Sequence, residues 1–316
     1  MRGLLKWFGD VNATFLSLAK VIVPVSIAVE LLSRWGLIEE IAPFLRPLMS
    51  IFGLPPEMGL VWLTGLFTSM WGAVAILFTV VPADTLTVAD VTVFSGLLLM
   101  AHALPLEQSV IRSVGPGFVV TALIRIVGAM LFAGLLRLIF DLTGWLAEPI
   151  QPTLSQEVFS VGEDGFWVGL VKMLFKIYVI LAILIYGLQL MEKSGAAQIF
   201  QRFAAPLLKL AGLKNEAVEV TSIGLIIGIA FGSGLLKRSA TRGQISSRQL
   251  WLSCIFLGFA HALVEDTLLM VALGADFTTV FFGRLAFAIV CTAVIAAGLR
   301  LVLDRKSQKC PGVSTD

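Results

Sequence analysis

Apolar residues recur in long runs from one end of the chain to the other, and short polar stretches separate them. The first half predicts a long apolar helix, an amphipathic stretch, a glycine-broken apolar segment and two further long helices, at 12–33, 36–52, 57–81, 90–113 and 117–143. The second half predicts the same order at 166–191, 195–211, 216–236, 249–273 and 277–302. Several of these runs reach the roughly 20 apolar residues that a membrane-spanning helix needs.

The two halves carry matching residues at a constant separation. Ala101-His102-Ala103-Leu104 matches Ala260-His261-Ala262-Leu263, and the separation of 159 residues also aligns two glycine-leucine segments that begin at Gly53 and Gly212. The chain has only 2 histidines, and they fall on each other. Because leucine matches are common in such a sequence and histidine matches are not, the pattern indicates a duplicated unit.

Composition is consistent with a membrane protein. Hydrophobic residues make up 58% of the 316 residues, charged residues only 14%, and the mean hydropathy is +0.94. This is too much apolar surface for a water-soluble globule. The net charge of +2 gives no reason to expect a nucleic-acid partner. The three cysteines, Cys254, Cys291 and Cys310, are isolated and predict neither a disulfide framework nor a zinc site.

Charge in the loops predicts the topology. The acidic stretch between the halves, which lacks Lys and Arg from 138 to 171, is expected outside, and the basic residues near both termini are expected in the cytoplasm. Each half then crosses an odd number of times, which four apolar segments allow only if the glycine-broken one is a re-entrant hairpin. We therefore predict an all-α integral membrane fold of two inverted repeats, each with about three spanning helices, an amphipathic helix and a re-entrant hairpin. The predicted units are a first repeat at 1–144, an extracytoplasmic linker at 145–164, a second repeat at 165–304 and a cytoplasmic tail at 305–316.

Charged residues inside the spans are the first candidates for function, because ionisable groups in a bilayer are costly. Glu107 and Arg125 lie equally far from the turn near Pro116, and Asp266 and Arg284 lie equally far from the corresponding turn in the second half. We expect Glu107 to pair with Arg125, and Asp266 with Arg284. Each pair either fastens its helical hairpin or leaves an arginine partly free to hold an anionic substrate.

The two histidines are the second candidates. His102 and His261 are expected near the middle of their helices and facing the interior of the bundle, with Glu265 four residues after His261. They either hydrogen-bond a neighbouring helix and do nothing more, or line a substrate path, take up a proton or bind a metal. No compact ligand spacing supports a metal, so neither a metal site nor a cofactor is expected.

The tips of the predicted hairpins are the third candidates. They carry small and hydroxyl residues that expose backbone amides near the midplane, or that serve only close helix packing. These residues are Thr68 and Ser69 in the first half and Gly232 and Ser233 in the second.

This combination of features resembles the nucleoside-recognition or "Gate" superfamily. The resemblance rests on an amphipathic stretch ending in Gly-Leu-x-x-Glu, the hairpin at 228–234, and the long helix with Ala-His-Ala-Leu. The group includes modules of concentrative nucleoside transporters, the membrane part of ferrous iron transporters, and spore maturation proteins. The resemblance implies a fold and a role in moving or sensing a solute, and it identifies no substrate.

The sequence therefore favours a permease for a small polar or anionic solute, nucleoside-like compounds included, with a proton or sodium as the coupling ion. A transporter of this kind is not an enzyme. The alternatives are a non-transporting membrane component similar to the spore maturation proteins, and a divalent-metal transporter or intramembrane metalloprotein. The expected setting is the bacterial cytoplasmic membrane with both termini inside, and a homo-oligomer is compatible with every alternative.

Overall fold

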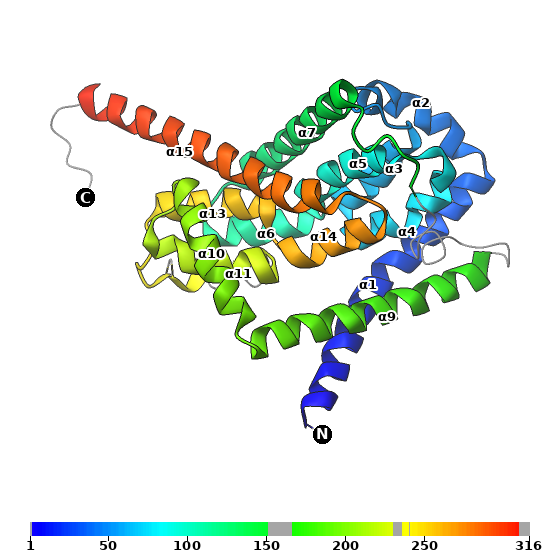
Figure 1. The fold of residues 1–316 in the computed structure, drawn as a ribbon, viewed down its shortest axis with the longest axis horizontal. Helices are drawn as coiled ribbons and strands as arrows, with labels where there is room; N and C mark the ends of the chain where they lie inside the picture. The colour runs from blue at the N-terminus through cyan, green and yellow to red at the C-terminus, as the bar shows by residue number, and fades with distance from the viewer. Residues whose placement is uncertain (1, 151–165, 230–235, 240, 310–316) are drawn as a thin grey trace.

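The computed structural model describes residues 2–150, 166–229, 236–239 and 241–309, and these residues are nearly all helical (Figure 1). The helices of the first half are α1 (Arg2–Arg34), α2 (Leu37–Ser50), α3 (Glu57–Phe67), α4 (Met70–Val80), α5 (Val88–Met100), α6 (Leu104–Val114) and α7 (Phe118–Thr143). Those of the second half are α9 (Phe166–Lys193), α10 (Ala196–Leu210), α11 (Asn215–Ile227), α13 (Ser247–Ala260), α14 (Leu263–Ala272) and α15 (Arg284–Lys309), which follows the π-helical turn η2 (Thr279–Gly283).

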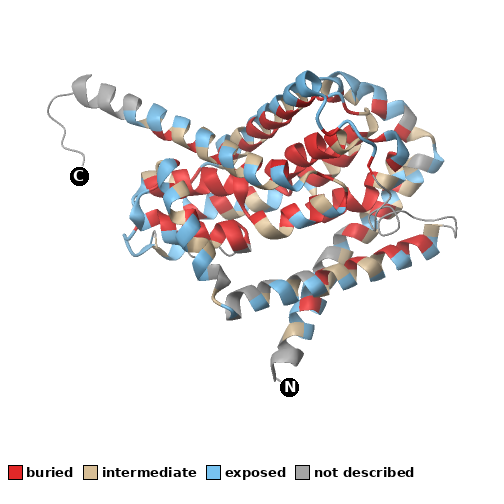
Figure 2. Ribbon diagram, viewed as in Figure 1, coloured by how far each residue is buried: buried red, intermediate tan, exposed pale blue. Residues whose placement is uncertain are grey.

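Five segments of the described chain are long and apolar enough to cross a membrane. Two of them lie largely inside the protein, since 83% of the most apolar window of Val88–Val114 and 78% of that of Ser247–Ala272 are buried. The other three, Phe118–Thr143, Phe166–Gly187 and Thr279–Arg300, are only 28–39% buried. Figure 2 shows the buried residues concentrated on the central helices and exposed ones along α7, α9 and α15. The outer helices carry exposed apolar side chains such as Phe175, Leu131 and Val294, which suit contact with lipid rather than water.

Matching helices of the two halves contact each other. Helix α1 packs against α9, α5 against α13, and α7 against α15. In Figure 1 the path from α5 to α6 and the path from α13 to α14 run in opposite directions across the molecule. Contacts between counterparts are what an internal two-fold relationship produces. The direction in which each half crosses a bilayer stays a prediction, as do the repeat and linker boundaries.

The local signals of the sequence are found where they were expected. Gly36 and Gly195 precede the amphipathic helices α2 and α10 with φ of 69° and 77°, a left-handed conformation that glycine adopts without strain. The first glycine-broken segment is interrupted between Phe67 and Met70, and the two resulting helices, α3 and α4, pack against each other as a hairpin. In the second half α11 ends at Ile227, and Gly228 follows with φ of 98°. The remainder of that segment lies largely outside the described residues.

The start of the interrepeat linker lies beside the loop that follows α4. The Val88 amide donates to the Glu148 carbonyl at 3.0 Å, and the Ile150 amide donates to the Leu86 carbonyl at 3.1 Å. The linker was predicted to be outside, and these bonds place the loop after α4 on the same side of the molecule as the start of the linker.

We expect cysteines at Asp84 and Thr241, two exposed positions, to label from opposite sides of the membrane. In a cysteine-free background, an impermeant thiol reagent added to intact cells should modify Asp84→Cys, whereas Thr241→Cys should react only after the membrane is opened. Glu148→Cys is the matched control, because its backbone is bonded to the loop near Asp84 and it should behave like Asp84→Cys. Labelling of Asp84→Cys and Thr241→Cys from one side would show that the repeats are not inverted.

Candidate functional site

The two central spans are broken at the histidines. Helix α5 ends at Met100 and α6 begins at Leu104, while α13 ends at Ala260 and α14 begins at Leu263. The expectation of uninterrupted helices over 90–113 and 249–273 is therefore wrong. Ala103 and Ala262 take the left-handed conformation, with φ of 46° and 43°, which an L-residue adopts only when its surroundings compensate.

The two arginines provide that compensation, because breaking a helix leaves carbonyls at its C-terminal end without a partner. Arg125 Nε donates to the Met100 carbonyl at 2.9 Å, and Arg284 Nε donates to the Phe259 carbonyl at 2.8 Å. Donors and acceptors correspond at the 159-residue separation, so the two breaks are built in the same way. A guanidinium is suited to this role because its donors form a rigid planar fork.

Arg284 also joins the two halves. Its Nη2 donates to the carbonyls of Leu99 and His261, both at 3.0 Å, and Leu99 belongs to the first half. Arg284 is 0% exposed and Arg125 is 1% exposed. Arg125 in turn crosses Gly258 of α13, where an added Cβ would lie 3.1 Å from Arg125 Cγ. Both arginines therefore hold the central helices together.

Each histidine is oriented by the helix that it ends. His102 Nδ1 lies 2.8 Å from the Leu98 carbonyl, and His261 Nδ1 lies 2.8 Å from the Leu257 carbonyl. A carbonyl can only accept, so each Nδ1 carries the hydrogen and a neutral imidazole presents a lone pair at Nε2. The two Nε2 atoms lie 3.3 Å apart. The histidines predicted to face the interior thus meet one another at the centre of the molecule.

Glu107 completes this centre. Its Oε1 lies 3.2 Å from His261 Nε2 and 3.5 Å from His102 Nε2, and its Oε2 accepts a short hydrogen bond from Arg125. The structure therefore places Glu107 against Arg125, as the spacing predicted, and also against both histidines. One ligand-type atom from each of Glu107, His102 and His261 lies within 4.8 Å of the others.

The second predicted pair is not formed. Arg284 donates to backbone carbonyls, and neither it nor Asp266, both described residues, is in an ion pair with the other. Asp266 Oδ2 instead lies 4.0 Å from His261 Nε2 and is buried without a hydrogen-bond partner. Aspartate is one methylene shorter than Glu107, its counterpart, and two of the three guanidinium nitrogens of Arg284 already donate to backbone carbonyls.

Several buried polar atoms around this centre have no protein partner. They include Arg125 Nη2 and Arg284 Nη1, both donors, and Asp266 Oδ2, an acceptor. Buried groups of this kind are ordinarily satisfied by protein, water or a ligand. These residues contact Glu107 or His261 through other atoms or lie close to them, so the centre has unused hydrogen-bonding capacity for a polar occupant.

The sequence of the chain is similar to that of known proteins. The family model described as "Gate: Nucleoside recognition" matches residues 15–129. This part of the chain is similar to the Gate family. It begins in α1, ends in α7, and contains His102, Glu107 and Arg125. The "Uncharacterized membrane protein YvoD" of Bacillus subtilis (strain 168) is 26% identical to the chain over 288 residues, which are 89% of each protein. No solved structure matches the chain.

The hairpin of α3 and α4 uses its hydroxyl groups locally. Ser69 caps α4 by accepting from the Gly72 amide at 3.0 Å, and the Thr68 hydroxyl donates to the Thr64 carbonyl at 2.6 Å. The hairpin contacts the α5 break through the Ala103 amide, which donates to the Gly65 carbonyl at 2.8 Å. Gly232 and Ser233, the predicted tip in the second half, lie outside the described residues.

Glu265 is half-buried in the first turn of α14, where the helix dipole favours a carboxylate. It is not part of the group formed by Glu107 and the histidines, although it lies next to Asp266 in the sequence.

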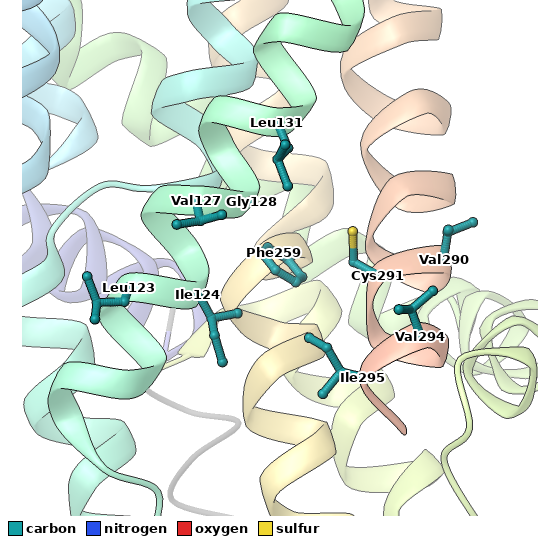
Figure 3. Close-up of a pocket in the computed structure, with 10 residues that line it drawn as sticks. All are labelled: Leu123, Ile124, Val127, Gly128, Leu131, Phe259, Val290, Cys291, Val294 and Ile295. Carbon is teal, nitrogen blue, oxygen red and sulfur yellow. The ribbon is translucent and has the colours of Figure 1, made fainter. Parts of the chain in front are cut away.

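A groove between α7 and α15 of the molecule is entirely apolar. Phe259 of α13 lies at its base, and Figure 3 shows the side chains that surround it. The lining residues are Leu123, Ile124, Val127, Gly128, Leu131, Phe259, Val290, Cys291, Val294 and Ile295. The groove lies on the two outer spans and has no charged or hydroxyl side chain. It suits an acyl chain and offers nothing to a polar solute.

Proposed function

We propose that the chain is a membrane permease that moves a small polar or anionic solute through the centre where its two halves meet. The observation that carries this proposal is the meeting of two broken helices, one from each half, with His102 and His261 Nε2 only 3.3 Å apart. Secondary transporters place substrate and ion sites at such repeat interfaces, where interrupted helices direct their ends toward the solute.

The charges at the centre favour a solute with an acidic or strongly polar group. Arg125 and Arg284 each keep one buried guanidinium nitrogen without a partner, and such nitrogens bind carboxylate or phosphate oxygens well. The description of the Gate family as "nucleoside recognition" makes nucleosides and their phosphates the first compounds to examine. The histidine pair could also take up a proton during transport, which would make the proton the coupling ion.

We expect His102→Gln and His261→Gln to reduce uptake to the level of protein-free vesicles while the protein remains folded. Glutamine keeps a donor and an acceptor but cannot bind a proton. The measurement is uptake by vesicles containing the purified protein, across labelled nucleosides, nucleotides and organic anions. Arg202→Gln, an exposed change in α10, is the control and should transport like the wild type.

A wild-type protein that takes up none of these compounds under any proton or sodium gradient would contradict the permease proposal. The alternative is then a non-transporting membrane component similar to the spore maturation proteins. Normal uptake by both histidine variants would reject the histidine pair as the solute site.

A further inference from the structure

We propose that His102, His261 and Glu107 bind a divalent transition-metal ion. The site is at the same centre as the proposed solute path, but the inference rests on the side-chain geometry alone. Metal binding is measured on purified protein and transport on vesicles. The metal proposal can therefore fail while transport is observed, and the transport proposal can fail while metal binding is observed.

The histidine tautomers are the first reason. Because both Nδ1 atoms are bound to carbonyls of their own helices, both neutral imidazoles present lone pairs at Nε2, and these face each other at 3.3 Å. Glu107 Oε1, another acceptor, lies 3.2 Å and 3.5 Å from them. Three acceptors with no hydrogen among them repel each other in a buried site. A cation between them removes the repulsion.

The distances are the second reason. Zinc binds imidazole nitrogen and carboxylate oxygen at about 2.0–2.1 Å in tetrahedral geometry, which places neighbouring ligand atoms roughly 3.3 Å apart. The observed separations of 3.2 Å, 3.3 Å and 3.5 Å match this spacing. The three atoms are therefore already placed as the ligands of one ion.

The contacts behind the ligands have the form found at metal sites. Metal-binding histidines ordinarily donate their second ring nitrogen to a carbonyl or carboxylate, which fixes the ring, and metal-binding carboxylates are themselves hydrogen-bonded. Leu98 and Leu257 supply the carbonyls here, and Arg125 holds the other oxygen of Glu107. Such support leaves the three ligand atoms little freedom to turn away.

Asp266 is an independent indication of a cation near the histidines. Its side chain is 8% exposed, and its Oδ2 has no hydrogen-bond partner and lies 4.0 Å from His261 Nε2. It is also the counterpart of Glu107 at the 159-residue separation. Asp266 lies outside the group of three ligand atoms, but it places a second negative charge, from the other half of the protein, close to His261.

The ligand set selects the kind of ion. Two imidazoles and a carboxylate suit Zn²⁺, Fe²⁺ or Co²⁺, whereas Mg²⁺ and Ca²⁺ require mostly oxygen and Cu⁺ prefers sulfur. The positive charges of Arg125 and Arg284 oppose a dication and weaken its binding. We therefore expect an exchangeable ion that must be supplied, rather than one retained through purification.

The test uses the full chain in detergent, stripped with a chelator and titrated with Zn²⁺ by equilibrium dialysis. The wild type should bind one Zn²⁺ per chain. His102→Gln and His261→Gln should each bind Zn²⁺ at least about tenfold more weakly, since even the loss of an outer partner costs 10- to 100-fold. Glu265→Gln is the matched control, a neighbouring carboxyl outside the ligand set, and should bind like the wild type.

Thermal melting separates loss of binding from loss of folding. Zn²⁺ should raise the melting temperature of the wild type and of Glu265→Gln but not that of the histidine variants, because only the native site binds the ion. Co²⁺ should give the absorption spectrum of a nitrogen- and oxygen-coordinated ion in the wild type. Absence of stoichiometric Zn²⁺ in the wild type, as expected if the imidazoles share a proton instead, would overturn the proposal. Undiminished binding by the double histidine variant, or equal loss in Glu265→Gln, would also overturn it.

Discussion

Replacing Arg284 with methionine should remove most of the stability of the folded protein. Three buried carbonyls, those of Leu99, Phe259 and His261, would lose their donor. A buried acceptor left unpaired costs about 1–3 kcal/mol. The sum is a large part of the roughly 5–15 kcal/mol by which native proteins are stable. We expect little monodisperse protein after extraction and a strongly lowered melting temperature, both measured by size-exclusion chromatography of heated samples.

Two further variants show whether the geometry or the charge of Arg284 is responsible for the stability that it contributes. Arg300→Met alters an exposed arginine on the same helix and should melt like the wild type. Arg284→Lys keeps the charge but lacks the planar fork, and should recover only a small part of the loss. If Arg284→Met melts as the wild type does, the arginine does not hold the broken helices together.

The second large effect is expected at the Glu107–Arg125 pair. Arg125→Met should leave Glu107, whose side chain is only 15% exposed, without its counter-ion. Glu107→Gln should likewise leave the buried Arg125 without a counter-ion. Removing one partner of a buried ion pair costs about 3–5 kcal/mol. The double variant should be more stable than the sum of the single changes predicts, because it removes both charges together. Recovery should be partial, since the Met100 carbonyl also loses its donor.

The exposed pair Glu30–Arg34 is the control for this double-mutant cycle. Its Arg34 Nε lies 2.7 Å from Glu30 Oε1, but the arginine side chain is 67% exposed. A surface pair of this kind contributes about 0–1 kcal/mol. The same cycle should therefore give a small coupling at Glu30–Arg34 and a large one at Glu107–Arg125. Additive effects at Glu107 and Arg125 would show that direct pairing contributes nothing to stability.

The helices and their order could be predicted from the sequence because they depend on local information. Runs of apolar residues defined the spans, and glycines such as Gly36 and Gly195 marked helix starts. The duplicated Ala-His-Ala-Leu motif identified the residues at the centre. Pro105, at the start of α6, was a signal for the first helix break. The continuous apolar run across this region hid that break. Val264 stands at the matching position of the second half and carries no such signal.

Tertiary structure decided where the charges found their partners. A helix break inside an apolar span is stable only if donors from elsewhere satisfy its carbonyls, and Arg284 reaches one such carbonyl, Leu99, across 185 positions of the chain. Glu107 reaches both histidines, whereas Asp266 Oδ2 has no hydrogen-bond donor. This difference depends on one methylene and on how the halves pack. By itself the sequence determined which residues are duplicated and which runs are apolar enough to be buried, because both can be recognised from the order of residues along the chain. Only packing of the two halves brought His102 within 3.3 Å of His261, because that distance depends on how helices far apart in the chain lie against each other.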